Sequence, residues 1–361
     1  MKTVPTNRTI LGLEITGPLI IAGPCSAETE EQILGTARQI ASLKNVSIFR
    51  AGIWKPRTRP GSFEGVGSIG LEWLKKAKAE TELRTTVEVA TAKHVYEALK
   101  YGIDFLWIGA RTIVNPFSVQ EIADSLRGVN IPVMIKNPIN PDLELWIGAI
   151  ERLQKAGITQ LAAIHRGFST YDKSQYRNKP MWEIPIELKR RMPDIPMICD
   201  PSHICGKTNL LLNVSQTAID LDYQGLMIET HCNPAFALSD AKQQITVTEL
   251  KELLKKIIIR VSFVEDKKFI GMLEGLRDKI DELDNDIVTI LANRMEISRT
   301  IGQCKKQNNI TILQRNRWNE IVQDRIKQGM EKHLTSDFVM KLFEIIHQES
   351  IHHQSLVMKD H

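Results

Sequence analysis

Eight short apolar runs in the first 260 residues constrain the fold more than any other feature of the chain. The runs are PLIIAG from Pro18, VSIFRAG from Val46, TTVEVA from Thr85, FLWIGA from Phe105, PVMIKN from Pro132, LAAIH from Leu161, PMICD from Pro196 and GLMIET from Gly225. They are rich in Ile, Val and Leu without strict alternation, which favours strands buried on both faces of a parallel sheet. Helical sequence follows most of them, often with a glycine at its end.

Eight β–α units at roughly 30-residue spacing predict an α/β fold of the (β/α)8 TIM barrel type. An open doubly wound sheet is the alternative, but eight regular units favour closure. The early segment TILGLEITG predicts a short hairpin that covers the bottom of the barrel. Thr246 and Glu249 have the spacing of a capping box and predict the start of the last barrel helix.

The rest of the chain predicts an all-helical second domain. A barrel commonly uses about 250 residues, which leaves about 100 of this chain. From Phe269 to about Gln303 the sequence is typical of one long helix, because apolar residues recur at spacings of three, four and seven. A polar break over 306–311 is followed by helices that start near Asn316 and Thr335. We therefore predict a barrel over 1–262, a linker over 263–269 and an all-α three-helix domain over 270–361.

The long helix also predicts a homodimer. Its apolar stripe consists of Leu273, Leu276, Ile280, Leu283, Ile287 and Leu291. A helix of this length with only two short partners cannot bury such a stripe alone, so we expect two copies of the chain to associate through the C-terminal helices.

Composition excludes several other classes of protein. The 47 Lys and Arg are nearly balanced by 43 Asp and Glu, which gives no support for a nucleic-acid partner. No apolar run approaches the about 20 residues of a membrane span, and residues 1–10 are too polar for a signal peptide. Five cysteines without a CxxC pair indicate a reduced, cytoplasmic chain.

Cationic groups follow or end many of the predicted strands, where a TIM barrel forms its active site. They are Arg50, Lys55, Arg57, Arg111, Lys136 and Arg166. Arg grips phosphate or carboxylate in a bidentate fork, and Lys acts as a point charge. Six such cations on one rim predict at least two anionic groups bound together, on two small-molecule substrates.

A second set of strand-end residues suggests a metal site. The set is Cys25, His203, Glu229 and Asp240. A thiolate, an imidazole and carboxylates suit one divalent ion such as Mn, Fe, Co or Zn rather than Ca. Spacing alone leaves His231, Cys232 and Cys199 open as alternative ligands.

The strings GPCSAE, KPRTRP, IGAR, IKNP, DPSH, IETH and ALSDAKQQ, in this order, resemble the 3-deoxy-arabino-heptulosonate 7-phosphate (DAHP) synthases, the first enzymes of aromatic amino-acid biosynthesis. KPRT distinguishes them from the sister 3-deoxy-manno-octulosonate 8-phosphate synthases, which have a KANRS-like segment there. The resemblance implies condensation of phosphoenolpyruvate with erythrose 4-phosphate and release of phosphate. The chain starts almost directly at the barrel, so we expect the N-terminal regulatory domain of some relatives to be absent.

The resemblance also implies roles for individual residues. The metal-ligand positions of the family match Cys25, His203, Glu229 and Asp240, and the phosphoenolpyruvate site matches Arg50, Lys55, Arg111, Lys136 and Arg166. Arg57 and Thr58 match the segment that holds erythrose 4-phosphate. As hypotheses, Lys55 donates a proton to the developing alkoxide and Glu88 positions the attacking water. Many relatives have Glu where this chain has His165, and no role is transferred to it.

The C-terminal segment LRDKIDELDNDIVTILANRMEIS resembles the all-helical chorismate mutases over about 90 residues. Arg277, Arg294, Lys305 and Arg317 fall at that family's spacing, and Ser350 and Gln354 match its remaining polar positions. The resemblance implies that arginines grip the two carboxylates of chorismate, that Lys305 and Gln354 face the ether oxygen, and that Arg277 crosses from a partner subunit. Gln314 and Trp318 depart from the pattern, because an acidic pair usually holds the substrate hydroxyl there.

The segment is consistent with two functions. One is an enzyme that rearranges chorismate to prephenate with no cofactor. The other is a dimerising module that senses chorismate or prephenate and has weak or no mutase activity. Under either, prephenate bound at the helices and restraining the barrel is a hypothesis, since fusion joins the entry enzyme of a pathway to a later step.

Overall fold

The computed structural model describes residues 7–56, 61–172, 174–260, 265–313 and 315–359, with only the backbone described at 7, 315–317, 319 and 320. The chain divides into two compact units, Met1–Ser262 and Phe263–His361.

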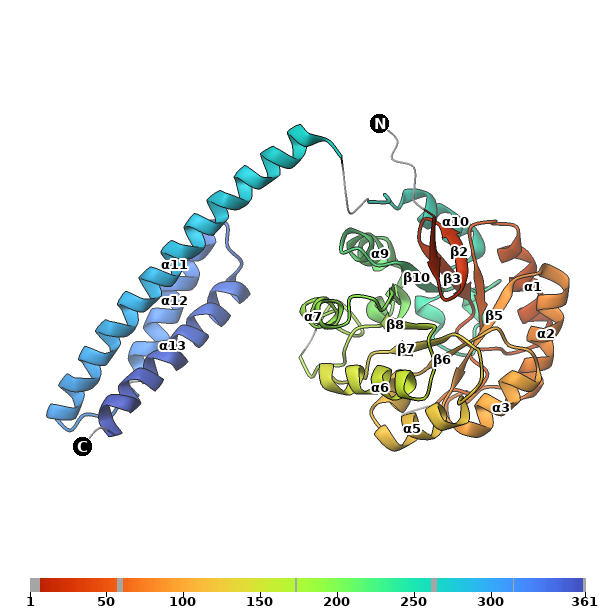
Figure 1. The fold of residues 1–361 in the computed structure, drawn as a ribbon, viewed down its shortest axis with the longest axis horizontal. Coiled ribbons are helices and arrows are strands. Elements are labelled where there is room, and N and C mark those ends of the chain that lie inside the picture. Colours follow the sequence, from red (N-terminus) through yellow and green to blue (C-terminus); the bar gives the residue numbers. More distant parts are fainter. Residues whose placement is uncertain (1–6, 57–60, 173, 261–264, 314, 360–361) are drawn as a thin grey trace. The chain divides into compact units, whose positions relative to one another are not determined.

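The first unit is a closed barrel of eight parallel strands in the order β10-β3-β4-β5-β6-β7-β8-β9 (Figure 1). The strands are β3 (Leu19–Gly23), β4 (Ile48–Arg50), β5 (Arg84–Val89), β6 (Phe105–Ile108), β7 (Val133–Lys136), β8 (Leu161–His165), β9 (Met197–Cys199) and β10 (Gly225–Glu229). Seven fall within one of the eight apolar runs and β5 begins one residue before its run, so the prediction of a TIM barrel is confirmed.

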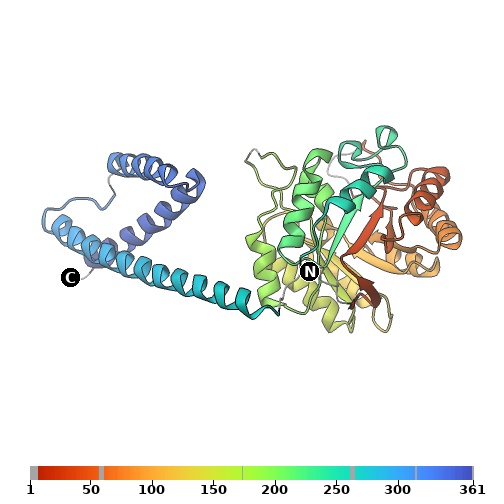
Figure 2. The same ribbon diagram turned by 90° about the horizontal axis from the view of Figure 1, so that it is seen from above.

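Helices surround the barrel (Figures 1 and 2). They are α1 (Glu30–Ala41), α2 (Ile69–Thr81), α3 (Ala92–Lys100), α4 (Ala110–Ile113), α5 (Pro116–Ser125), α6 (Leu143–Lys155), α7 (Glu183–Arg191), α8 (Pro201–Cys205), α9 (Leu211–Asp220) and α10 (Val247–Lys256), with 3-10 turns η1 (Thr208–Leu210), η2 (Pro234–Phe236) and η3 (Ala241–Gln243). Thr246 and Glu249 form the predicted capping box of α10. Thr29, Thr91, Asn115 and Asp142 accept backbone hydrogen bonds at the starts of α1, α3, α5 and α6.

Alternate strand residues belong to two different cores. In β6, Leu106 and Ile108 pack outward against the helices, whereas Phe105 and Trp107 belong to the interior cluster of the barrel. Because side chains alternate along a strand, a run that is apolar at every position fills both layers. This explains why the eight runs lack alternation.

A two-stranded antiparallel hairpin, β1 (Asn7–Ile10) and β2 (Leu13–Thr16), joins the interior cluster. Ile10, Leu13 and Ile15 pack with the inward side chains of the barrel strands. The predicted hairpin is therefore present, and it seals the apolar end of the barrel interior, which leaves the other end for polar groups.

The second unit consists of three helices, α11 (Lys267–Gln307), α12 (Arg315–Glu331) and α13 (Ser336–Lys359). The helix α11 begins within the range predicted as linker, because the side chain of Asp266 accepts hydrogen bonds from the backbone of Lys268 and Phe269 and caps the first turn. No helix among the described residues is long and apolar enough to cross a membrane.

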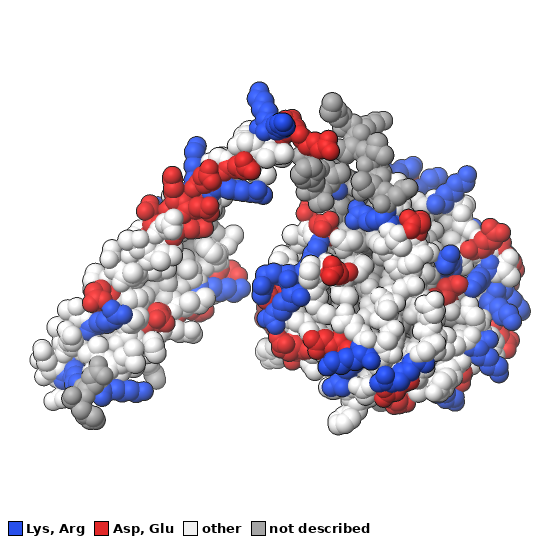
Figure 3. All heavy atoms as spheres, viewed as in Figure 1, with Lys and Arg blue, Asp and Glu red and all other residues white. Residues whose placement is uncertain are grey.

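Only the C-terminal part of α11 is covered. Its buried residues are Met295, Ser298 and Gly302. The residues of the apolar stripe that are largely exposed, at 50% or more, are Leu276, Ile280, Leu283 and Ile287. Acidic side chains gather on the same N-terminal half of α11 (Figure 3), so this half is amphipathic and lacks an apolar partner among the described residues of the helical unit.

Candidate active sites

Side chains on alternate residues of each barrel strand point into the barrel. The last inward residue of each strand lies at its carboxyl end or within one position of it. These end residues are Gly23, Arg50, Glu88, Gly109, Lys136, Arg166, Asp200 and Glu229. Six of the eight are charged, although they continue the same faces that carry the apolar interior. The change from apolar to charged residues along the inward faces puts a polar floor at one end of the barrel.

Two of the end residues are glycines because their neighbours occupy the space. A Cβ atom built on Gly109 would lie 1.9 Å from Oε1 of Glu88. At Gly23, which has a φ of 145°, a Cβ atom would lie 2.1 Å from the backbone oxygen of Arg50. Glycine at these places lets charged groups from adjacent strands approach each other closely.

Trp107 lies beneath the charged groups as a platform. Its indole is fully buried and its Nε1 donates to Oε2 of Glu88 at 3.2 Å. The guanidinium of Arg50 lies 5.0 Å, and Nζ of Lys136 5.8 Å, from the centre of its ring. Both distances are in the range of cation–π attraction, so one aromatic side chain orients two cations and one carboxylate.

Two buried ion pairs cross the floor. Arg50 lies 3.2 Å from Oε1 of Glu229, and Nζ of Lys136 lies 2.8 Å from Oδ2 of Asp200. Burial opposes the charge of Arg50, but the carboxylates of Glu229 and Asp200 more than offset it and raise the arginine pKa. Buried ion pairs contribute little net stability, and Nε and Nη1 of Arg50 have no hydrogen-bond partner in the described chain. The small gain in stability and the unpartnered nitrogens of Arg50 both favour a ligand-binding role for the charged residues of these two ion pairs.

A concentration of guanidinium groups lies above the floor. A cavity here is lined by Lys55, Pro56, Glu88, Gly109, Ala110, Arg111, Lys136, Arg166, Arg177, His203 and Asp240. Burial lowers the pKa of Arg166 to about 10, the charges of Arg177 and Arg111 push it the same way, and Asp200 opposes them. Repulsion among these guanidinium groups would be relieved by an anionic ligand.

The four predicted metal ligands face each other in pairs. Sγ of Cys25 lies 3.4 Å from Oδ2 of Asp240, and Nε2 of His203 lies 3.7 Å from Oε1 of Glu229. They come from the loop after β3, from α8, from the end of β10 and from the loop after β10. Among the described residues no three His, Cys, Asp or Glu side chains lie close enough to hold an ion in this arrangement.

An ammonium group lies beside this set. Nζ of Lys55 donates to the backbone oxygen of Cys25 at 2.9 Å and to its Sγ at 3.2 Å. Burial opposes the charge of Lys55, but Cys25, Glu88 and Glu229 raise its pKa overall. Burial, reinforced by Glu229, raises the pKa of the Cys25 thiol to about 12.

The set fits a divalent metal ion by two observations. Oε1 of Glu229 is buried and pairs with the guanidinium of Arg50 at 3.2 Å, but it accepts no hydrogen bond within the described chain, so a lone pair remains for a ligand. The donors are one sulfur, one imidazole nitrogen and carboxylate oxygens, a mixture that suits Mn, Fe, Co or Zn.

The alternative ligands lie elsewhere. Cys199 points outward from β9 into the core beneath the helices. His231 accepts a hydrogen bond at Nδ1 from the backbone of Asn233, and its Nε2 is 3.7 Å from Glu28. Cys232 borders the same outer pocket as His231 and Glu28. These three residues therefore lie apart from the pairs that Cys25 forms with Asp240 and His203 forms with Glu229.

His165 also points away from the cavity. It is fully buried, its Nε2 lies 2.7 Å from the backbone oxygen of Pro180, and its Nδ1 lies 3.0 Å from the hydroxyl of Tyr223. Its ring packs edge-on against Trp182 at 5.0 Å. Burial lowers its pKa to about 3, so His165 is a neutral packing residue.

Several site residues were missed from the sequence. They are Trp107, Arg177, Asp200, Gln243 and Gln244. Asp200 is part of the DPSH string, and the two glutamines are part of ALSDAKQQ, so those strings carried a signal. Trp107 looks like an ordinary core residue of an apolar run. Arg57 and Thr58 lie outside the described residues.

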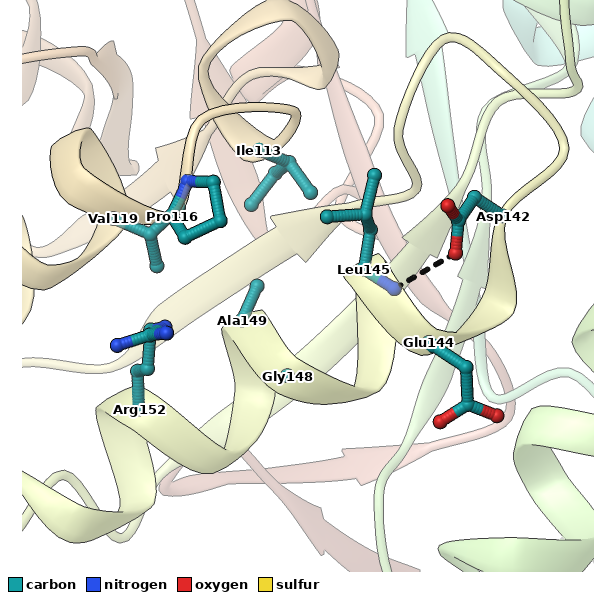
Figure 4. Close-up of a pocket in the computed structure, with 9 residues that line it drawn as sticks. All are labelled: Ile113, Pro116, Val119, Asp142, Glu144, Leu145, Gly148, Ala149 and Arg152. Atoms are coloured by element: carbon teal, nitrogen blue, oxygen red, sulfur yellow. Dashed lines mark hydrogen bonds between the residues drawn. The ribbon is translucent and has the colours of Figure 1, made fainter.

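A second cavity lies on the outside of the barrel, between α4, α5 and α6 (Figure 4). It is mainly apolar, and its charged residues have structural partners. Asp142 caps α6 by accepting from the backbone of Leu145, Arg152 donates to Gln120, and Glu144 pairs with Arg191. We assign it no chemistry.

The helical unit brings four of its predicted site residues together. Arg294 on α11 donates to the hydroxyl of Ser350 on α13, and Nζ of Lys305 lies 3.1 Å from Oε1 of Gln354. Ser350 and Gln354 are buried. Gly302 lets α13 approach α11, because a Cβ atom there would lie 3.1 Å from Cα of Gln354. Burial lowers the pKa of Arg294.

The other predicted residues of this site are not part of that cluster. Arg277 is exposed, two and a half heptads before Arg294 on the same helix. Seventeen residues of α-helix span about 26 Å, so Arg277 cannot reach a ligand held by Arg294 in the same chain. The side chain of Arg317 and all of Gln314 lie outside the described parts. Trp318 stacks on His347 with ring centres 4.0 Å apart.

Comparison with known proteins agrees with both units. Residues 10–261 match the DAHP synthetase I family, and residues 276–355 match chorismate mutase type II. A phospho-2-dehydro-3-deoxyheptonate aldolase of Thermotoga maritima is 33% identical over 238 residues, 66% of this chain and 68% of that protein. A 2-dehydro-3-deoxyphosphooctonate aldolase of Variovorax paradoxus is 28% identical over 267 residues, 66% of this chain and 88% of that protein.

Solved structures give the same result. A crystal structure of the Thermotoga maritima DAHP synthase has a TM-score of 0.61 and 30% identity, and covers 70% of this chain and 72% of its own. A truncated form of that synthase has a TM-score of 0.59 and 27% identity, with coverage of 70% and 90%. Together these findings show that the chain is an enzyme of the DAHP synthetase I family that carries a chorismate mutase type II domain after its barrel.

Proposed function

We propose that the barrel condenses phosphoenolpyruvate with erythrose 4-phosphate to give DAHP and phosphate. The observation that carries this proposal is the cationic cavity at the carboxyl ends of the strands, where Lys136 and Arg166 are buried beside Arg111 and Arg177. Two phosphorylated substrates repel each other, and a cavity of this charge holds both in reach of one another.

The residues of the cavity divide the work. Arg50, Arg111, Lys136 and Arg166 bind the phosphate and carboxylate of phosphoenolpyruvate. Lys55 donates its proton to the oxygen of the aldehyde as the new carbon–carbon bond forms. Glu88, held by the indole of Trp107, orients the water that attacks C2 of phosphoenolpyruvate. Arg57 and Thr58 bind erythrose 4-phosphate.

Cys25, His203, Glu229 and Asp240 would hold one divalent ion, Mn, Fe, Co or Zn. When bound, such an ion supplies Lewis-acid polarisation of the aldehyde carbonyl. The support is the buried Oε1 of Glu229, which pairs with Arg50 but accepts no hydrogen bond within the described chain, and the proximity of Cys25 to Asp240 and of His203 to Glu229.

The choice of aldehyde tests the barrel proposal. We expect rapid loss of phosphoenolpyruvate with erythrose 4-phosphate and release of one phosphate for each molecule consumed. Arabinose 5-phosphate, which has one more carbon, should react at least about 100-fold more slowly in kcat/KM, about 3 kcal/mol of discrimination. Equal or faster consumption with arabinose 5-phosphate would assign the barrel to the octulosonate reaction instead.

For the helical domain we propose rearrangement of chorismate to prephenate. The supporting observation is the cluster of Arg294, Lys305, Ser350 and Gln354 between α11 and α13. Arg294 would grip a carboxylate, and Lys305 and Gln354 would donate to the ether oxygen as its bond breaks. The reaction needs no covalent group, so orientation and electrostatic stabilisation suffice.

This site requires a second copy of the chain. Arg277 is the further predicted clamp, but it lies about 26 Å along α11 from Arg294. The exposed apolar half of α11 would bury its stripe against the same half of the other copy. A homodimer of this kind supplies Arg277 of the second copy to each site.

Mixing two inactive variants tests the shared site. In a two-fold symmetric dimer, one R277A chain and one R294A chain form one site with both changes and one intact site. Random exchange makes half of the dimers mixed, so the 1:1 mixture should recover about a quarter of wild-type mutase activity. Each variant exchanged with itself is the control. A mixture as inactive as its components would place both arginines of a site in one chain.

A further inference from the structure

The loop between β8 and α7 contacts the separate pieces of chain that carry the proposed metal ligands. These ligands come from different loops and a short helix, so their mutual positions depend on side chains that bridge those pieces. Two consecutive residues of this loop, Arg177 and Asn178, make the bridging contacts. An antiparallel bridge between Phe168 and Lys179 closes the loop just behind them.

Arg177 connects two of the proposed ligands. Its Nη1 donates to Oδ1 of Asp240 at 2.9 Å and to Oε1 of Gln243 at 2.7 Å. Nε2 of Gln243 then donates to Oε2 of Glu229 at 2.7 Å. One guanidinium therefore orients Asp240 directly and Glu229 through a buried amide. These hydrogen bonds leave the other oxygen of each carboxylate facing another proposed ligand. Oδ2 of Asp240 lies beside Cys25, and Oε1 of Glu229 lies 3.7 Å from His203.

Asn178 connects the third ligand. It is buried, its Nδ2 donates to the backbone oxygen of His203 at 2.6 Å, and its backbone N–H donates to Ile204. The backbone N–H of Arg177 donates to Cys205 in the same way. The loop thus packs along α8, the helix that presents His203.

The backbone at Asp240 and after α8 has conformations that the contacts of Arg177 help to hold. Asp240 has a φ of 50°, in the left-handed region that costs a residue other than glycine about 1 kcal/mol or more. Gly206, at a φ of 67°, ends α8 where a Cβ atom would lie 2.5 Å from Cβ of Arg177. The strained Asp240 and the tight turn after α8 are both in contact with the same arginine.

We infer that Arg177 and Asn178 are positioning residues that set the affinity of the proposed site for a divalent ion. Arg177 orients Asp240 and, through Gln243, Glu229; Asn178 fixes the backbone that carries His203. This inference rests on the proposed metal centre. Partners that orient ligands in this way typically change metal affinity by about ten- to a hundredfold when they are replaced.

The test is titration of the metal-free, full-length protein with Co²⁺ alone. Binding is measured by calorimetry and by the absorption band of a cobalt–thiolate bond. We expect one ion per chain in the wild type, about ten- to a hundredfold weaker binding in R177Q, and an intermediate value in R177K, which keeps one hydrogen bond. R38Q is the matched control, because Arg38 makes an exposed ion pair with Glu80 on the helices. It should bind Co²⁺ like the wild type.

A different role for Arg177 gives a different result. If R177Q binds Co²⁺ as tightly as the wild type and only the KM for phosphoenolpyruvate rises, Arg177 is a substrate ligand and the inference is wrong. If R177Q does not fold, Q243M breaks the same relay from the other side and should weaken Co²⁺ binding in the same range. Equal affinity in Q243M would overturn the relay. A wild type that shows no cobalt–thiolate absorption would instead reject the proposed centre at Cys25.

Discussion

Replacing Lys55 with methionine is expected to lower kcat for the condensation by about 10²- to 10⁴-fold, the usual contribution of a positioned general acid. Lys55 lines the cavity with Glu88, and its Nζ lies 3.2 Å from Sγ of Cys25, so its ammonium group is in contact with one of the proposed metal ligands. Methionine keeps the length and apolar stem of lysine but has no proton to give.

Rapid quench and product analysis at saturating substrates measures this effect. Lys55→Arg is the informative second variant, because it keeps the positive charge and gives up its proton far less readily. We expect Lys55→Arg to bind phosphoenolpyruvate with a near-normal KM and to remain slow. Near-normal turnover in Lys55→Met would show that another group donates the proton.

Replacing Arg294 with methionine is expected to lower kcat/KM for the mutase reaction by about 10²- to 10³-fold, comparable to removal of one donor from an electrostatic site. Arg294 is half-buried between α11 and α13 and donates to Ser350. Burial lowers its pKa, so a bound carboxylate would stabilise its positive charge. Chorismate absorbance at 25 °C follows the loss directly.

Ser350→Ala is the matched control for packing, because it removes the hydroxyl partner and leaves the guanidinium. We expect Ser350→Ala to lose less than about tenfold, since it removes one neutral hydrogen bond. Wild-type protein that binds prephenate but does not consume chorismate would assign the helices to sensing rather than catalysis. Arg294→Met with unchanged activity would remove Arg294 from the site.

The barrel was predictable because both faces of its strands are buried. The side chains of a run such as FLWI, from Phe105 to Ile108, pack alternately in the barrel interior and against the helices, so every position of the run is apolar. Because every position is apolar, the sequence does not show which side chains point into the barrel. Trp107 could therefore not be distinguished from Leu106 without the register of the strands. Charged strand ends were visible, but their pairing, Arg50 with Glu229 and Lys136 with Asp200, depends on closure of the barrel.

Contacts between distant loops were not predictable. Arg177 lies in a polar loop with no strand signal beside it, and its partners are 63 and 66 residues further along the chain. In the helical unit the sequence predicts Lys305 and Gln354 in one site, and the structure places Nζ of Lys305 3.1 Å from Oε1 of Gln354. Arg277 differs, because helix geometry places it beyond the reach of the cluster in its own chain.

The two proposed activities are tested most directly by following loss of phosphoenolpyruvate and loss of chorismate in separate assays, each with and without a strong chelator. We expect the chelator to abolish the first reaction and added Mn²⁺ or Co²⁺ to restore it, whereas the second reaction continues unchanged. Persistent loss of phosphoenolpyruvate in metal-free protein would contradict the centre at Cys25, His203, Glu229 and Asp240. Loss of both reactions would contradict the assignment of two independent chemistries to the two units.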